Sequence, residues 1–221
     1  MKQILLIEDD AAISRLVRMV LLGAGVRMTH AEDGESGLHQ AESQRFDAVL
    51  LDLTLPGISG PEVLKALTFR GTTPVIVLTA SDAQETLAEC VRCGAFDVVR
   101  KPFDPEKLAA CVQLAVGETP ANATKQGPVK SGDLMLDFGA YRLTSQYANP
   151  GHTTQLSLSE WRILERLAAT PGEVVLYQEL LGRVWGPGFR GHVQFLQAWI
   201  ERLSKKVPLS VSHGVGYALV V

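Results

Sequence analysis

The strongest constraint on the fold is a regular alternation of short apolar runs with amphipathic helix patterns over residues 1–117. Residues 2–7 form an apolar run of strand length. Residues 11–22 place apolar side chains at the i, i+3, i+4, i+7 spacing of a helix with one buried face. The same strand–helix pair then recurs. Further strands are expected at 26–31, 46–51, 74–78 and 97–100, and further helices at 34–43, 60–69, 84–93 and 105–116.

This order of elements restricts the fold class. Nearly unbroken apolar strands that are separated by helices indicate a parallel sheet with both faces covered. The first part of the chain is therefore predicted to be an α/β domain, a doubly wound (βα)5 sheet. In such a sheet, ligands bind at the carboxyl ends of the strands, so candidate functional residues are sought at that edge.

A segment with few large apolar residues, 118–131, separates this domain from the rest of the chain. It contains Pro120 and Pro128 and is interpreted as a linker between domains 1–117 and 132–221. No apolar run approaches the roughly 20 residues that span a bilayer, and three cysteines are too few for a disulfide framework. A cytoplasmic protein that does not enter a membrane is therefore expected.

Domain 132–221 has the pattern of a winged helix. Strand-like runs at 132–137, 141–144 and 153–156 come first, and a helix follows the capping box Ser157-Leu-Ser-Glu160. Two more helices are expected at 178–185 and 192–207, with the loop 186–191 between them. Alternating apolar residues around a glycine-rich turn at 209–221 predict a final β-hairpin.

Side chains of strong chemical character stand near the ends of the strands of the first domain. Glu8 and Asp9 follow the first strand, Asp52 and Thr79 follow the third and fourth, and Lys101 follows the fifth. Because these ends share one sheet edge, the groups are expected to lie together. Three carboxylates there repel one another unless a hard divalent cation such as Mg²⁺ lies among them. An ammonium and a hydroxyl beside them suit a phosphoryl group.

These residues stand in motifs that resemble those of response-regulator receiver domains. With Pro-Gly-Glu-Val, Val-Trp-Gly and Gly-x-Gly-Tyr217 in the second domain, they make the chain similar to the OmpR/PhoB winged-helix family. Residues 184–187 and 195–199 most resemble the KdpE-like subgroup of that family, which regulates potassium-transport operons. The receiver motifs are Leu-Leu-Ile-Glu8-Asp9-Asp10, Leu-Leu-Asp52-Leu-Thr-Leu-Pro56-Gly57, Val-Leu-Thr79-Ala80 and Arg-Lys101-Pro102-Phe103.

The resemblance implies a two-component response regulator. A sensor histidine kinase would phosphorylate Asp52, and the second domain would bind promoter DNA. Thr79 and Lys101 would bind phosphoryl oxygens, and the chain would be no enzyme apart from slow loss of its own phosphoryl group. The implied Mg²⁺ ligands are acidic side chains and one main-chain oxygen, those of Glu8, Asp9, Asp52 and, through its carbonyl, Thr54.

Phosphorylated members of the family form dimers through helix four, strand five and helix five, where this chain departs from the usual residues. Val98 replaces an aromatic side chain that normally moves together with the threonine. Lys107 and Cys111 stand where the family has Glu and Arg. A homodimer is therefore expected with a more apolar or differently arranged interface. Cys90 and Cys93 fit either simple packing or a thiol cluster on that face.

The third helix of a winged helix enters the major groove, and its hairpin approaches the minor groove. The implied partner is duplex DNA with direct repeats. The loop 186–191 is either a contact for RNA polymerase or a plain connection, and Trp199 is either a core residue or a base contact. Residues 120–221 carry 10 Lys and Arg against 7 Asp and Glu, a mildly basic balance. The predicted DNA contacts are Gln194, Gln197, Glu201, Arg202, Lys205 and, in the hairpin, His213.

Two other functions stay open from the sequence alone. Val98 and the altered dimer face favour a winged-helix DNA-binding regulator that is indifferent to phosphorylation. The thin basic charge of the second domain favours a receiver-regulated module that binds a protein. The first alternative predicts equal operator affinity with and without the carboxylate of Asp52, and the second predicts no selected DNA sequence.

Overall fold

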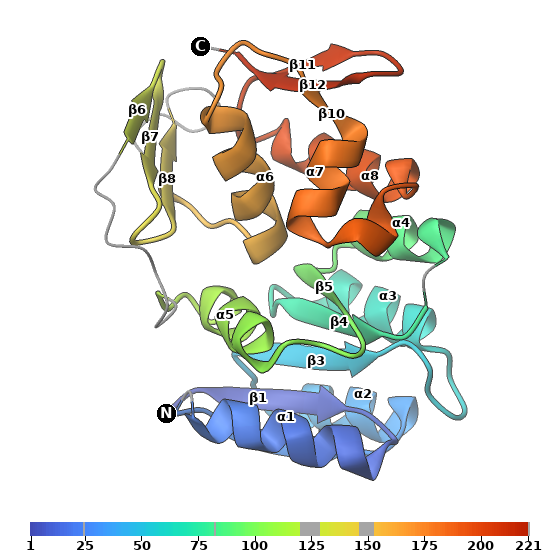
Figure 1. The fold of residues 1–221 in the computed structure, drawn as a ribbon. Coiled ribbons are helices and arrows are strands. Elements are labelled where there is room, and N and C mark those ends of the chain that lie inside the picture. Colours follow the sequence, from blue (N-terminus) through green and yellow to red (C-terminus); the bar gives the residue numbers. More distant parts are fainter. Residues whose placement is uncertain (24, 82, 120–128, 146–152, 221) are drawn as a thin grey trace. The chain divides into compact units, whose positions relative to one another are not determined.

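The fold was analysed in a computed structural model, which describes residues 1–119, 129–145 and 153–220 with the exception of residues 24 and 82. The chain divides into two compact units, Met1–Pro120 and Ala121–Val221 (Figure 1). Within the described part of the chain, no helix combines the length and the apolar character needed to cross a membrane.

The N-terminal unit contains a parallel sheet of five strands in the order β2-β1-β3-β4-β5 (Figure 1). This is the predicted (βα)5 topology. The strand order reverses between β1 and β3, and a crevice forms at such a switch point, beyond the carboxyl ends of the strands. The strands are β1 (Gln3–Ile7), β2 (Arg27–Ala31), β3 (Ala48–Asp52), β4 (Val75–Thr79) and β5 (Asp97–Arg100).

Helices cover both faces of this sheet, as expected for a parallel sheet. α1 packs beside α5 on one face, and α2 packs beside α3 on the other (Figure 1). Their ends lie within one residue of the predicted bounds because local signals set them. The Oδ1 atom of Asp10, for example, accepts hydrogen bonds from two amides at the start of α1. The helices are α1 (Ala11–Gly23), α2 (Gly34–Ser43), α3 (Gly60–Arg70), α4 (Gln84–Arg92) and α5 (Pro105–Ala115).

The C-terminal unit is a winged helix, as predicted. An antiparallel sheet, β6-β7-β8-β9, precedes three helices, and a second antiparallel sheet, β10-β12-β11, forms the hairpin. The strands are β6 (Val129–Ser131), β7 (Leu134–Asp137), β8 (Arg142–Ser145), β9 (Thr153–Thr154), β10 (Val175–Leu176), β11 (Leu209–Ser212) and β12 (Gly216–Leu219). The helices are α6 (Leu158–Ala168), α7 (Tyr177–Val184), the short 3-10 helix η1 (Pro187–Phe189) and α8 (Val193–Leu203).

Two predicted boundaries in this half of the chain differ from the structure by three residues or more. β6 lies inside the predicted linker 118–131, because its backbone pairs with β7 from Val129↔Leu136 to Ser131↔Leu134. α8 ends at Leu203 and not at 207. Pro208 disfavours helical backbone in the residue before it, so the helix cannot continue to that point.

Trp199 belongs to the core of the C-terminal unit. Its side chain is 0% exposed and its ring lies 6.2 Å from that of Trp185 and 6.1 Å from that of Phe195, measured between ring centroids. Of the two interpretations from the sequence, the structure therefore supports the core residue. A ring that is buried in an aromatic cluster does not reach a base edge.

The cysteines of the N-terminal unit also fit the packing interpretation. Cys90 and Cys111 are buried, and burial raises the pKa of the Cys90 thiol to about 12. The Cys93 thiol donates to the carboxylate of Glu89 at 3.3 Å, one turn earlier in α4. Thiols with a raised pKa are poor nucleophiles and poor metal ligands at neutral pH.

Candidate functional site

The predicted acidic and basic side chains lie together at the carboxyl edge of the parallel sheet. Asp52 is the last residue of β3 and Thr79 the last residue of β4, and both are buried. Lys101 follows β5, and its amide donates to the carbonyl of Thr79 at 2.7 Å. Glu8 follows β1 and is held by a hydrogen bond from its amide to the carbonyl of Ala31. Strand pairing therefore fixes the backbone from which each group projects.

Lys101 bridges two carboxylates. Its Nζ atom lies 2.7 Å from Oε2 of Glu8 and 2.9 Å from Oδ2 of Asp52. Burial lowers the pKa of Lys101, but hydrogen bonds and charge from the two carboxylates outweigh this effect and raise it overall. Burial is also the main reason why the pKa of Glu8 is raised, with Lys101 opposing that shift. The ammonium thus stays charged beside Asp52.

The carboxylates of Glu8, Asp9 and Asp52 form a compact acidic cluster. One oxygen of each lies within 4.8 Å of the others, and Asp9 is exposed whereas the other two are buried. Three hard oxygen donors with one open side fit Mg²⁺, which keeps several of its own waters. Glu8, Asp9 and Asp52, with the carbonyl of Thr54, would hold the ion. When bound, it would neutralise carboxylate charge and bind a phosphoryl oxygen.

The loop after β3 is held in place by contacts that support this cluster. The amide of Thr54 donates to Oδ1 of Asp52 at 3.2 Å. Gly60, at the start of α3, lies so close to β3 that a Cβ atom there would come within 2.6 Å of the Leu53 carbonyl oxygen. This close approach of the backbone to Leu53 therefore requires glycine at position 60.

Three supporting contacts had no signal in the sequence. Nε2 of His30 lies 2.8 Å from the Glu8 carbonyl oxygen, across the β1–β2 pair. The amide of Ile58 donates to Oε1 of Glu35 at 3.3 Å, which ties the loop after β3 to α2. The Ser81 amide donates to the hydroxyl oxygen of Thr79 at 3.0 Å. The first two depend on neighbours that only the folded chain brings together, whereas the third joins residues two apart in the loop after β4.

The predicted DNA-contacting residues of α8 divide into two groups. Gln194, Gln197, Glu201 and Lys205 are exposed, and their spacing of three or four residues places them along one face of the helix and the turn after it. His213 is exposed at the turn of the β11–β12 hairpin. These five residues are placed where a DNA contact is sterically possible.

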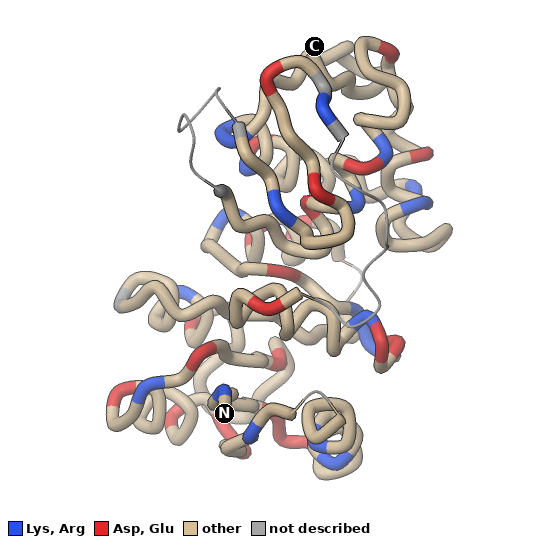
Figure 2. The backbone as a smooth tube through the Cα atoms, turned by 90° about the vertical axis from the view of Figure 1, so that its left-hand side faces the viewer, with Lys and Arg blue, Asp and Glu red and all other residues tan. Residues whose placement is uncertain are grey.

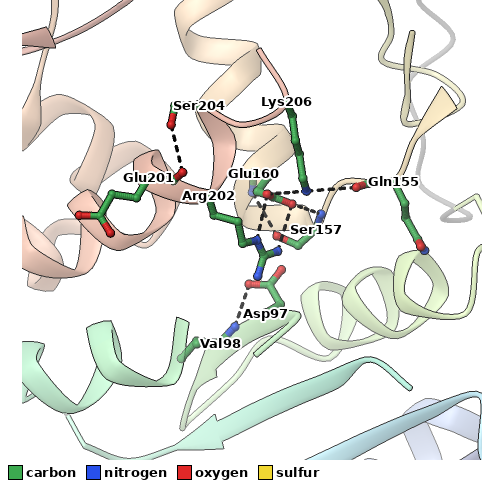
Figure 3. A network of polar contacts seen from close by, with 9 residues as sticks. All are labelled: Asp97, Val98, Gln155, Ser157, Glu160, Glu201, Arg202, Ser204 and Lys206. Carbon is green, nitrogen blue, oxygen red and sulfur yellow. Dashed lines mark hydrogen bonds and ion pairs between the residues drawn. The ribbon is translucent and has the colours of Figure 1, made fainter. Parts of the chain in front are cut away.

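Arg202 lies differently from the prediction. Its guanidinium donates from Nε to Oε1 of Glu160 at 3.0 Å and from Nη2 to Oε2 at 3.1 Å (Figure 3). It also lies 4.7 Å from the centroid of the Trp199 ring. A guanidinium that is committed to both oxygens of an internal carboxylate cannot also read guanine through the same forked donors. We therefore assign Arg202 to the interior of the domain.

Glu160 is the centre of this network. Its carboxylate is fully buried and also accepts from the amide of Ser157 at 2.9 Å and from Nζ of Lys206 at 2.7 Å (Figure 3). The capping box was evident in the sequence, but the second role of Glu160 was not. The residue joins the start of α6 to the end of α8.

Because of this network, we expect the stability of the C-terminal unit to fall in acid. Burial raises the pKa of Glu160. The charges and hydrogen bonds of Arg202 and Lys206 lower it by more than burial raises it, so the net pKa is below its usual value of 4.5. The folded state then binds the Glu160 proton more weakly than the unfolded state does. Its stabilising contribution is complete above about pH 4.5 and is lost as the pH falls through the folded-state pKa.

Urea unfolding monitored by tryptophan fluorescence checks this expectation, since all three tryptophans lie in the C-terminal unit. The free energy of unfolding should decline below about pH 4.5 in the wild type. In Glu160→Gln, which has no carboxyl at this position, the decline should be smaller. Equal pH profiles for the two proteins would contradict the assignment.

Comparison with known proteins agrees with both halves of the chain. Residues 4–113 match the model of the response regulator receiver domain, and residues 151–219 match that of the C-terminal domain of transcriptional regulatory proteins. The sensory transduction protein RegX3 of Mycobacterium tuberculosis is 31% identical over 229 residues, which cover 99% of each chain. The KDP operon transcriptional regulatory protein KdpE of Escherichia coli is 32% identical over 225 residues, 98% of each chain.

A solved structure matches the chain over both of its units. The response regulator DrrB of Thermotoga maritima, an OmpR/PhoB homologue, matches with a TM-score of 0.50 and 29% identity over the full length of both chains. Nearly equal identities to RegX3 and KdpE do not separate the subgroups of the family. Together, the parallel sheet with its acidic edge, the winged helix and these matches show that the chain belongs to the OmpR/PhoB-type response regulators, non-enzymatic transcription factors with a receiver domain and a DNA-binding output domain.

Proposed function

We propose that a sensor histidine kinase phosphorylates Asp52 and that this modification controls binding of the winged-helix domain to promoter DNA. The observation that carries the proposal is the position of the Lys101 ammonium, 2.9 Å from the buried Asp52 carboxylate and 2.7 Å from Glu8. A charged donor that is held beside a buried nucleophile provides the positioning and charge neutralisation that phosphoryl transfer requires.

Each side chain of the site has a specific part in this proposal. An oxygen of Asp52 attacks phosphorus, the bond from phosphorus to the donor breaks, and an acyl phosphate remains on Asp52. Lys101 and Thr79 would bind the transferred phosphoryl oxygens. Glu8 keeps Lys101 charged and oriented through the 2.7 Å contact. Asp9 and the carbonyl of Thr54 would complete the oxygen donors for Mg²⁺.

DNA binding would use the exposed face of α8. Gln194 and Gln197 can read adenine, Glu201 can accept from cytosine, and Lys205 can contact phosphate or guanine. Dimers would place two such helices on direct repeats, with His213 of the hairpin toward the minor groove. The KdpE-like motifs favour a potassium-transport operon as the target. Within the loop 186–191, the exposed residues Pro187, Gly188 and Gly191 are the proposed contact for RNA polymerase.

In-vitro selection of operator sequences, with and without acetyl phosphate, tests this function. We expect a repeated motif whose affinity rises after acetyl phosphate treatment of the wild type and does not rise in Asp52→Asn. Equal operator affinity in all samples would support a DNA-binding regulator that is indifferent to phosphorylation. Failure to select any sequence would support a module that binds a protein. Either result would overturn the proposal.

The dimer face leads to a separate expectation. Cys111 is buried where the family has an arginine, and Lys107 is exposed where it has a glutamate. Exposed ion pairs contribute only about 0–1 kcal/mol each, and salt screens them. A dimer formed with the phosphate mimic beryllofluoride should therefore persist in high salt. Light scattering at low and high ionic strength measures this, and dissociation of the dimer in high salt would contradict an apolar interface.

A further inference from the structure

The winged-helix unit has few basic residues where its DNA-binding elements lie. Binding to DNA depends on neutralising phosphates with Lys and Arg, and each such contact steepens the dependence on salt. Residues 209–219, which form the hairpin, contain no Lys, Arg, Asp or Glu. Figure 2 shows Lys and Arg as short, separated blue stretches and not as one basic block. The phosphate contacts must therefore come from a few specific positions.

α8, the recognition helix that is proposed to enter the major groove, itself offers little exposed positive charge. Arg202 and Lys206 both bind Glu160 inside the domain. Glu201 is exposed and acidic, so within α8 and the turn that follows it, Lys205 is the exposed basic residue. A helix face with one cation and one anion contributes no net charge to the attraction of DNA.

Two exposed arginines lie in the segment of chain that leads from α7 to α8. Arg183 is in the last turn of α7, and Arg190 directly follows η1, three residues before α8 begins. No hydrogen bond or ion pair joins either side chain to another described residue. The carbonyl of Val184 at the end of α7 accepts a hydrogen bond from a different arginine, Arg162, at 3.3 Å. Neither Arg183 nor Arg190 therefore caps this carbonyl.

The side chain of Arg190 packs against a glycine in α7. A Cβ atom at Gly182 would lie 3.3 Å from Nε of Arg190, so the guanidinium group lies across the helix at this residue. Glycine inside a helix costs about 1 kcal/mol relative to alanine. Here it leaves the space in which the arginine lies, one residue from Arg183. The two arginines therefore lie at the same end of α7.

The exposed cations lie near both ends of the recognition helix, α8. Arg183 and Arg190 lie near its N-terminal end, and Lys205 lies just beyond its C-terminal end. An 11-residue helix is about 16 Å long, and the major groove is about 12 Å wide. Cations beyond both ends of a helix in the groove can thus reach the phosphates of both strands.

From this arrangement, and building on the proposed function, we infer that Arg183 and Arg190 bind the phosphates of one DNA strand while Lys205 binds those of the other. Base reading is then left to the uncharged side chains and Glu201 on α8. In this arrangement, the two arginines supply affinity that does not depend on sequence, and the hairpin supplies no charged contact.

Fluorescence anisotropy with the selected operator and with a scrambled duplex, over a range of salt concentrations, tests the inference. Arg183→Gln and Arg190→Gln should each weaken binding to both duplexes by a similar factor. Each should lower the slope of log K against log salt by about 1, and the double variant by about 2. Arg142→Gln is the matched control, because Arg142 is also exposed but lies on β8. Its slope should equal that of the wild type, and circular dichroism would confirm that every variant is folded.

The outcomes separate the inference from the proposed function. Folded arginine variants with the wild-type slope would overturn the inference, while the function would stand because the wild type still selects an operator. Variants that bind DNA normally but reduce transcription by RNA polymerase in vitro would also overturn it, since the arginines would then face the polymerase. If the wild type selects no DNA at all, the proposed function itself fails.

Discussion

Asp52→Asn is expected to abolish phosphorylation by acetyl phosphate or by a histidine kinase. The substitution keeps the size of a buried side chain but replaces the carboxylate nucleophile by an amide that cannot form an acyl phosphate. Lys101 keeps its contact with Glu8, so the site should stay assembled. Incorporation of radiolabelled phosphate that resists acid and is released by base should fall below detection, a loss of at least about 100-fold.

A matched control makes this result specific. Asp133 is an exposed aspartate in a turn of the C-terminal unit, and Asp133→Asn should be labelled like the wild type. Undiminished labelling of Asp52→Asn would place the acceptor elsewhere, with exposed Asp9 as the next carboxylate to examine. Chelation of divalent cations should block labelling of the wild type, because the acidic cluster would then lack its counter-charge.

Glu160→Ala is expected to destabilise the C-terminal unit by about 3–5 kcal/mol. The carboxylate is the counter-charge of Arg202 and Lys206 and also accepts from the Ser157 amide. Its removal leaves two cations inside the domain with no anion between them. Urea unfolding followed by tryptophan fluorescence isolates this unit, because the N-terminal unit contains no tryptophan.

Glu165→Ala serves as the comparison, since Glu165 is exposed on the same helix. It should change the free energy of unfolding by less than about 0.5 kcal/mol. If the free energy of unfolding of Glu160→Ala is within about 1 kcal/mol of the wild-type value, water must solvate the two cations once the carboxylate is removed. The network would then not stabilise the domain.

Much of the N-terminal unit could be predicted from sequence because its signals are local. Apolar runs, helix periodicity and caps place every strand and helix of that unit within two residues of their observed ends. The cluster of Asp52, Lys101 and the acidic pair was also predictable, since parallel strands bring their carboxyl ends to one edge. The contacts of His30 and Glu35 were not, because each depends on a partner more than 20 residues away.

The second domain shows a different limit of sequence analysis. Helical periodicity places Arg202 at the edge of the polar face of α8, where solvent and DNA are the expected neighbours. It carries no information about Glu160, which lies 42 residues earlier and meets Arg202 only after α6 and α8 have packed. The two-residue strand β10 is too short to give any alternating pattern, and it exists because β12 pairs with it.

The position of Glu160 has a consequence for how such a regulator could acquire new target genes. Because one internal carboxylate joins α6 to α8, the orientation of α8 is fixed. The preferred DNA sequence therefore cannot be changed by tilting or sliding this helix alone. Changes in preferred sequence would instead have to occur at Gln194, Gln197 and Glu201, whose side chains are exposed on α8. Recognition can therefore diversify at these three positions while the scaffold that presents them stays intact.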